Sequence, residues 1–124
     1  MSNGIGDHIA NSFATVKGQV GVSVTYTRGD RAVALVAVPS TTEFEVETGD
    51  VIEYAQSRDF TILASDLKFG GFATLPERGD TIRESIEGTE QTHDVRAPAG
   101  SVHFRWLDPY RKVLKIHTTQ TTSN

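Results

Sequence analysis

The sequence predicts a mainly β domain, a small β-barrel or sandwich of about seven to eight short antiparallel strands with one N-terminal α-helix and long loops. Three observations lead to this prediction. Apolar residues near the N-terminus recur at helical spacing, apolar and polar residues alternate from residue 20 onward, and turn residues follow roughly every 8–12 positions. A chain of 124 residues has the length of one domain. We therefore expect a single domain over 1–124, with β structure over about 20–118 and a frayed tail over 119–124.

The N-terminal segment has one apolar face. Its apolar residues lie three or four positions apart, which is typical of an amphipathic helix: Ile5, Ile9, Phe13, Val16 and Val20. Asp7 lies near the start of this pattern, and Lys17 and Gly18 lie near its end, where helix ends favour such residues. The pattern predicts a helix over about 5–17.

The rest of the chain alternates in short runs that are separated by turn residues. Thr27–Asp30 supplies the first turn, and Pro39 is expected to end the second strand, because proline cannot donate to a strand ladder. The stretch 64–78 breaks the pattern and is expected to be a loop. The predicted strands lie over 20–27, 32–38, 44–46, 51–55, 60–63, 81–87, 91–95, 102–106 and 112–118.

Composition excludes several classes of protein. The chain has no cysteine, so disulfides and thiolate metal sites are excluded. The net charge of −4 argues against a protein that grips nucleic acid along its backbone, although it suits a wall past which DNA slides. No apolar run approaches the ~20 residues of a membrane helix, and the N-terminus lacks the features of a signal peptide. We expect no membrane partner.

No catalytic, cofactor or metal site is predicted. The four histidines are His8, His93, His103 and His117, and none falls into a metal-binding spacing. A metal enzyme that uses His93 and His103 stays open, because these two could approach each other across paired strands. No serine lies in a Gly-x-Ser-x-Gly elbow. Glu43, Glu45 and Glu47 alternate on one strand face, which favours a solvated face over a general acid and its partner.

One cluster combines aromatic and basic residues, namely Phe104, Arg105, Trp106, Tyr110 and Arg111. In a barrel that binds oligonucleotides, such side chains stack on bases and neutralise phosphates. Alternatively, Phe104 and Trp106 lie two apart on a strand, so both can fill the core while Arg105 faces outward. The acidic composition favours the core interpretation, and the nucleic-acid module remains the alternative.

The order of several short phrases resembles a known family. These phrases occupy 24–29, 58–62, 65–67, 76–82, 105–110 and 114–118, and the likeness covers roughly 8–118. The chain resembles the head–tail joining or head-completion proteins of tailed bacteriophages, the connectors of the phage neck. The resemblance implies a small β-barrel or sandwich with an added helix, and it carries over no catalytic residue.

That resemblance also implies a role and its partners. The expected protein is a stopper-like ring, with a hexamer as its expected form, that forms below the portal after DNA packaging, helps to retain the genome and docks the tail. Its partners would be further copies of itself, the portal or adaptor ring, tail proteins, and packaged double-stranded DNA that passes through the channel without sequence-specific binding. It would be located in the virion neck and assembled in the host cytoplasm. The β-rich pattern favours a stopper over a helical adaptor.

Two sets of residues follow from these expectations. Loops are the natural contact surfaces between ring neighbours or with the channel, which gives Phe69, Gly70, Gly71, Phe72, Arg96, Ser101 and His103. The matched phrases contain the expected determinants of the fold, which are Tyr26, Asp59, Phe60, Gly79, Asp80, Trp106, Asp108 and Pro109.

Overall fold

The computed structural model describes residues 9–10, 20–98 and 101–123. Within these ranges nearly all of the regular structure is β. The strands are β1 (Val22–Arg28), β2 (Arg31–Thr48), β3 (Val51–Leu63), β4 (Lys68–Phe69), β5 (Phe72–Ala73), β6 (Thr81–Ile86), β7 (Thr89–Val95), β8 (Phe104–Trp106) and β9 (Val113–Ser123). A single 3₁₀ turn, Ala64–Asp66, follows β3.

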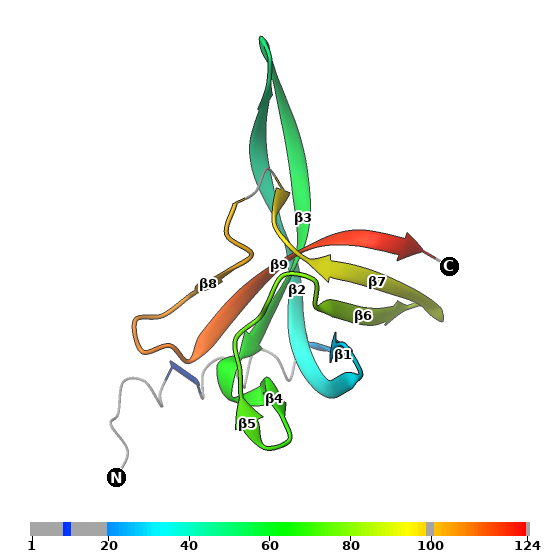
Figure 1. Ribbon diagram of the computed structural model, residues 1–124, viewed down its shortest axis with the longest axis vertical. Coiled ribbons are helices and arrows are strands. Elements are labelled where there is room, and N and C mark those ends of the chain that lie inside the picture. The colour runs from blue at the N-terminus through cyan, green and yellow to red at the C-terminus, as the bar shows by residue number, and fades with distance from the viewer. Residues whose placement is uncertain (1–8, 11–19, 99–100, 124) are drawn as a thin grey trace.

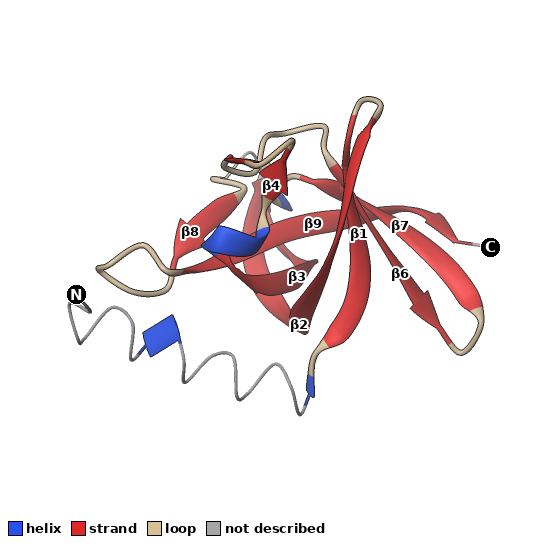
Figure 2. Ribbon diagram, turned by 90° about the horizontal axis from the view of Figure 1, so that it is seen from below, coloured by secondary structure: helices blue, strands red, loops and turns tan. Residues whose placement is uncertain are grey.

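Six of these strands close into an antiparallel barrel. The sheet runs in the order β3-β2-β1-β6-β7-β9, and β3 then pairs with β9 to close it. β8 adds to β9 outside this ring of strands, while β4 and β5 form a separate two-stranded sheet. β8 and the β6–β7 hairpin extend to opposite sides of the barrel (Figures 1 and 2). The predicted β class is confirmed, and its architecture is a barrel.

The core follows from the alternation of the strands. Val24 and Tyr26 on β1 lie opposite Leu35 and Val33 on β2, so apolar side chains from neighbouring strands share one face. Fully buried residues from β3 and β9 complete this face. The main core residues are Val24, Tyr26, Leu35, Ala37, Phe60, Ile62, Leu67, Ile82, Val95, Leu114 and Ile116.

The prediction that Pro39 ends a strand is wrong. β2 continues through Pro39, which lies opposite Phe60 of β3. The last residue of β2 that pairs with β1 is Ala37. Beyond it β2 is paired on one side only, and a strand edge accepts the missing N–H of proline. Two predicted short strands therefore merge into one long strand, and the same happens in β3.

The merged strands form a two-stranded arm that projects from the barrel (Figure 1). We define the arm as residues 43–56, from the pair Glu43–Gln56 to the pair Thr48–Val51. Pairing of β3 with β9 begins only at Arg58, so no third strand among the described residues pairs with either edge of the arm. Gly49 at its tip has a φ of 63°, a left-handed conformation that glycine adopts without strain.

The structure describes the C-terminal segment almost to its end, but only a small part of the N-terminal segment. The helix expected over 5–17 lies outside the described residues, apart from Ile9 and Ala10. The frayed tail expected over 119–124 is wrong as far as Ser123, because β9 continues to that residue and pairs with β7. Threonine-rich segments favour strands, and the threonine-rich end of β9 finds a partner in the edge of β7.

β7 and β8 lie along one edge of β9 in succession. The N–H of Arg96 donates to the carbonyl of His117 at 3.1 Å, and the N–H of His117 donates to the carbonyl of His103 at 2.8 Å. The chain thus leaves β9 after Arg96 and returns to it at His103. We call the segment between these two bonds the excursion; its described residues, 97–98 and 101–102, pair with no strand.

Candidate functional site

Asp80 ties together several segments of the barrel wall. It lies immediately before β6, where it accepts a hydrogen bond from the Tyr26 hydroxyl and a bidentate pair from Arg28, with Nη2–Oδ2 at 2.8 Å. Arg28 also donates to the carbonyl of Leu75 at 2.7 Å. Burial raises the pKa of Asp80, but the bonds from Arg28 and Tyr26 outweigh it and hold this pKa below its usual value. The cluster anchors the loop before β6.

A second buried carboxylate, Glu84 on β6, joins β7 and β3. Nε2 of His93 lies 2.7 Å from its Oε2, and Arg58 holds both oxygens, with Nη2–Oε1 at 2.8 Å and Nε–Oε2 at 3.0 Å. Burial disfavours the charged imidazole and lowers the pKa of His93 despite the nearby carboxylate. Glu84 is thus occupied by one partner from the adjacent strand β7 and one from β3, which is not adjacent to β6 in the sheet.

A third cluster contains serine, histidine and aspartate without forming a catalytic triad. Ser57 Oγ lies 2.5 Å and His117 Nδ1 lies 2.8 Å from the same oxygen, Oδ1 of Asp59. In a triad the histidine stands between the other two and uses both nitrogens, and the serine faces the substrate. Ser57 is instead buried. Burial raises the pKa of Asp59, but bonds from His117, Ser57 and Thr42 hold it below its usual value.

The residues considered for a metal site have separate partners. His93 contacts Glu84, whereas His103 Nε2 lies 2.9 Å from the carbonyl oxygen of Pro76. Across the described ranges, no group of three or more His, Asp or Glu side chains could hold a metal ion. No helix in the same part of the chain is long and apolar enough to cross a membrane.

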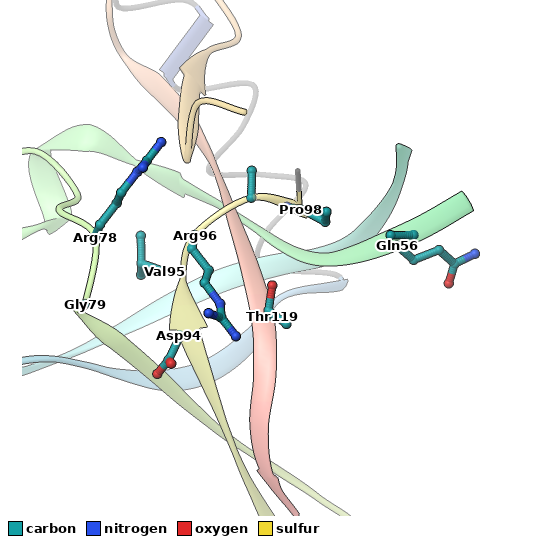
Figure 3. A pocket seen from close by; sticks show the side chains of 10 residues that line it. Gln56, Arg78, Gly79, Asp94, Val95, Arg96, Pro98 and Thr119 are labelled. Carbon is teal, nitrogen blue, oxygen red and sulfur yellow. The ribbon is translucent and has the colours of Figure 1, made fainter. Parts of the chain in front are cut away.

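Three of the expected contact residues lie at or within the excursion between β7 and β8: Arg96 and His103 flank it, and Ser101 lies within it. Arg96 lines a pocket of about 650 Å³, and its side chain extends toward Thr119 of β9 (Figure 3). The carbonyl of Ser101 accepts a bond from Arg78 Nη2 at 3.2 Å, which links the excursion to the loop before β6. The pocket also borders Gln56 at the base of the arm. It is a junction of loops and strands whose lining includes the charged residues Arg78, Asp94 and Arg96.

The other expected contact residues form the β4–β5 hairpin, away from this pocket. Phe69 is buried and packs 6.2 Å from the Tyr26 ring. Gly70 and Gly71 make the turn with positive φ, and Phe72 after them is 80% exposed. The structure therefore separates the expected contact residues into two surfaces.

The aromatic residues of the mixed cluster pack on the core. Phe104 and Trp106 contact the core cluster, and their rings meet edge to face with centroids 6.5 Å apart. Arg105 between them is exposed. This confirms the core interpretation, and it leaves few aromatic faces for base stacking.

The turn after β8 is organised by Asp108. Its carboxylate accepts hydrogen bonds from the backbone N–H groups of Tyr110, Lys112 and Val113 at 2.8 to 3.0 Å. Pro109 lies exposed in this turn. The basic residues around it form what we call the β8–β9 surface: Arg105, Arg111, Lys112 and Lys115.

The remaining residues expected to determine the fold lie in or beside the barrel. Phe60 is fully buried in the core. Gly79 precedes Asp80 with a φ of 94°, a conformation that side chains rarely adopt. Val95 returns across this corner, where its N–H donates to the Asp80 carbonyl at 2.8 Å.

The arm is a surface that the sequence did not predict. The arm carries Glu43, Glu45, Glu47, Asp50 and Glu53, and no residue from 43 to 56 is Lys or Arg. Val51 and Ile52 are each 56% exposed, and Tyr54 is 65% exposed. The sequence signal for this surface was the alternation of glutamates beside apolar residues. A face that contacts only solvent would not be expected to carry Ile52 and Tyr54.

In the described residues, polar clusters join the strands of a closed barrel, and an acidic arm and a basic turn are exposed; these are features of a structural binding protein. The chain matches the family model for the phage head–tail joining protein over residues 7–124, and it belongs to that family. It is therefore a structural protein of the virion that contacts components of the head and the tail, and its family is not one of enzymes. Among curated proteins, none matches the chain.

Proposed function

We propose that this protein acts as a stopper-like ring in the phage neck. Six copies assemble below the portal or an adaptor ring after packaging, help to retain the genome and present a docking surface for the tail. The observation that carries the proposal is membership of the head–tail joining family over nearly the whole chain.

Features of the fold support an assembly role. A ring subunit needs two different, complementary surfaces for its two neighbours. It also needs a rigid body that holds those surfaces at a fixed angle, which a closed barrel supplies. The net charge of −4 suits a wall that repels DNA phosphates and lets the genome pass without gripping it.

A phage carrying a null allele of this gene tests the proposal. We expect DNA-filled heads without tails, which lose their DNA to nuclease over time, and restoration of tailed, nuclease-resistant particles by the wild-type gene. Electron microscopy and DNA protection assays give the two readouts. Null particles that keep tails and protected DNA would overturn the role.

The ring itself is tested separately. Native mass spectrometry of the purified protein, alone and with the portal or neck components, should show a species of six subunit masses. A protein that stays monomeric with every neck component would contradict the ring.

A further inference from the structure

We propose that the arm of one subunit docks on the β8–β9 surface of the next copy, with acidic and apolar side chains of the arm facing basic and apolar side chains of that surface. This inference rests on the proposed ring and identifies the contact that would build it.

The arm has the chemistry of an unpartnered half of an interface. Glu45 lies opposite Tyr54 and Glu47 lies opposite Ile52, so acidic and apolar side chains share one face of the ribbon. An isolated two-stranded ribbon is marginally stable in water. No described strand pairs with either edge of the arm. A partner that covers this face would bury the apolar groups and complete the edges.

The β8–β9 surface has the opposite charge. Arg105 lies directly opposite Lys115 on β9, and Arg111 and Lys112 follow in the adjoining turn. The one carboxylate in this segment, Asp108, is turned onto backbone N–H groups. Leu107 and Tyr110 are both partly exposed beside these charges.

The surface also offers backbone groups. β8 is the last strand of the sheet, so its outer edge has no partner strand in the described part of the chain. The backbone bonds to β9 that flank β8 fall at His103 and Leu107. By the alternation of antiparallel ladders, the N–H and C=O groups of Phe104 and Trp106 therefore point outward. An extended ribbon can pair with such an edge.

The two surfaces lie on different parts of the molecule. The arm rises from one end of the barrel, whereas β8 and the turn after it lie to one side (Figure 1). One subunit therefore displays the two unlike, complementary patches that a head-to-tail contact needs. A symmetric contact of arm with arm would bring two acidic ribbons together, and like charges across an interface repel.

A charge swap tests the pairing. One variant carries Glu43→Lys, Glu45→Lys and Glu47→Lys, which lie on one face of the arm, and the other carries Arg105→Glu, Arg111→Glu and Lys112→Glu. We expect each variant alone to assemble about 100-fold more weakly than wild type, because like charges then face each other. An equimolar mixture should assemble again, because each arm then meets a surface of opposite sign.

Native mass spectrometry and sedimentation velocity measure the assembly, and circular dichroism checks the fold of each variant. A matched control, Asp30→Lys with Glu87→Lys and Glu90→Lys, reverses three exposed charges away from both surfaces and should assemble like wild type. Raising the salt from about 0.05 M to about 0.5 M should weaken the wild-type contact, because exposed charges are screened. If the arm reversal impairs folding, replacement of residues 45–54 by Asn-Gly supplies the arm-deficient subunit.

The outcomes separate this inference from the proposed function. If wild type forms rings and either reversal leaves assembly intact, or if the mixture fails to recover, the arm contact is wrong while the ring stands. If wild type never assembles, even with portal and neck components, both proposals are overturned.

Discussion

Asp80 illustrates how a single carboxylate organises a small barrel. It accepts bonds from Tyr26 and Arg28 on β1 and from the N–H of Glu77 in the preceding loop. Arg28 in turn holds the carbonyl of Leu75. One side chain therefore joins a strand to a loop that contains little regular structure.

Replacing Asp80 by Asn should destabilise the protein by about 3 kcal/mol, because it leaves the partly buried guanidinium of Arg28 without its charge partner. Tyr26→Phe should cost about 1–2 kcal/mol, since it removes one buried hydrogen bond and keeps the ring in the core. Urea denaturation followed by tryptophan fluorescence measures both changes. Asp30→Asn, at an exposed turn, should stay within about 0.5 kcal/mol of wild type. An Asp80→Asn protein as stable as wild type would show that the cluster contributes little.

Local turn chemistry could be recognised at this scale, whereas the partners of polar residues could not. Gly79-Asp80 is visible as a turn from its composition alone. The bond from Tyr26 to Asp80 joins residues 54 positions apart, and that from His117 to Asp59 joins residues 58 apart. Periodicity assigns residues to faces, but it does not specify which distant strands become neighbours.

At the level of secondary-structure elements, the main feature is the arm. Its base is tied to the barrel by the Phe44 ring, which meets the His117 ring edge to face with centroids 5.4 Å apart. Beyond that point its side chains are mostly exposed. The arm thus contributes little to the core although it is part of the two longest strands.

Replacing residues 45–54 by Asn-Gly should therefore leave the barrel intact, because Phe44 and Ala55 are retained and Asn-Gly suits a two-residue hairpin turn. We expect the free energy of unfolding to change by less than about 1 kcal/mol, while ring assembly is lost. Denaturation and sedimentation velocity give the two readouts. A large loss of stability would mean that the arm belongs to the cooperative core.

Strand boundaries were the least predictable feature at this scale. Pro39 and the pair Arg58-Asp59 are reasons to interrupt a strand when only the local sequence is considered. The structure accommodates Pro39 at a one-sided pairing and Asp59 through bonds from its neighbours. Both solutions depend on other strands, so the sequence predicted two short runs where one long strand exists.

Barrel closure is the defining property of the whole molecule. Pairing of β3 with β9 removes the free edges that an open sheet would leave along the barrel. The β class and the barrel alternative followed from alternation and turn spacing. Closure did not, because β3 and β9 are far apart in the chain and no local pattern reports their meeting.

The buried titratable groups give the molecule a defined dependence on pH. The pKa of His93 is lowered from 6.5 by burial, so the unfolded chain binds a proton at higher pH than the folded one. Stability should therefore decline as the pH falls below about 6.5. The pKa values of Asp59 and Asp80 are lowered from 3.8, so their contribution is present above about pH 4 and lost as the pH falls further.

Denaturation midpoints measured from pH 8 to pH 3 should show a plateau, a first decline below about 6.5 and a steeper one below about 4. In His93→Gln the first decline should shrink while the second remains. A midpoint that rises between pH 7 and pH 5 would contradict the buried, neutral state of His93.

The excursion between β7 and β8 has a practical consequence. Because the chain leaves and rejoins the edge of β9 at the two backbone bonds of His117, the register of both strands is set independently of the length of the segment between them. A short peptide epitope or a fluorophore-labelled cysteine can therefore be grafted there without shifting the barrel. A tag that leaves assembly intact would allow neck assembly to be followed in real time, and one that blocks assembly would place this segment at a contact.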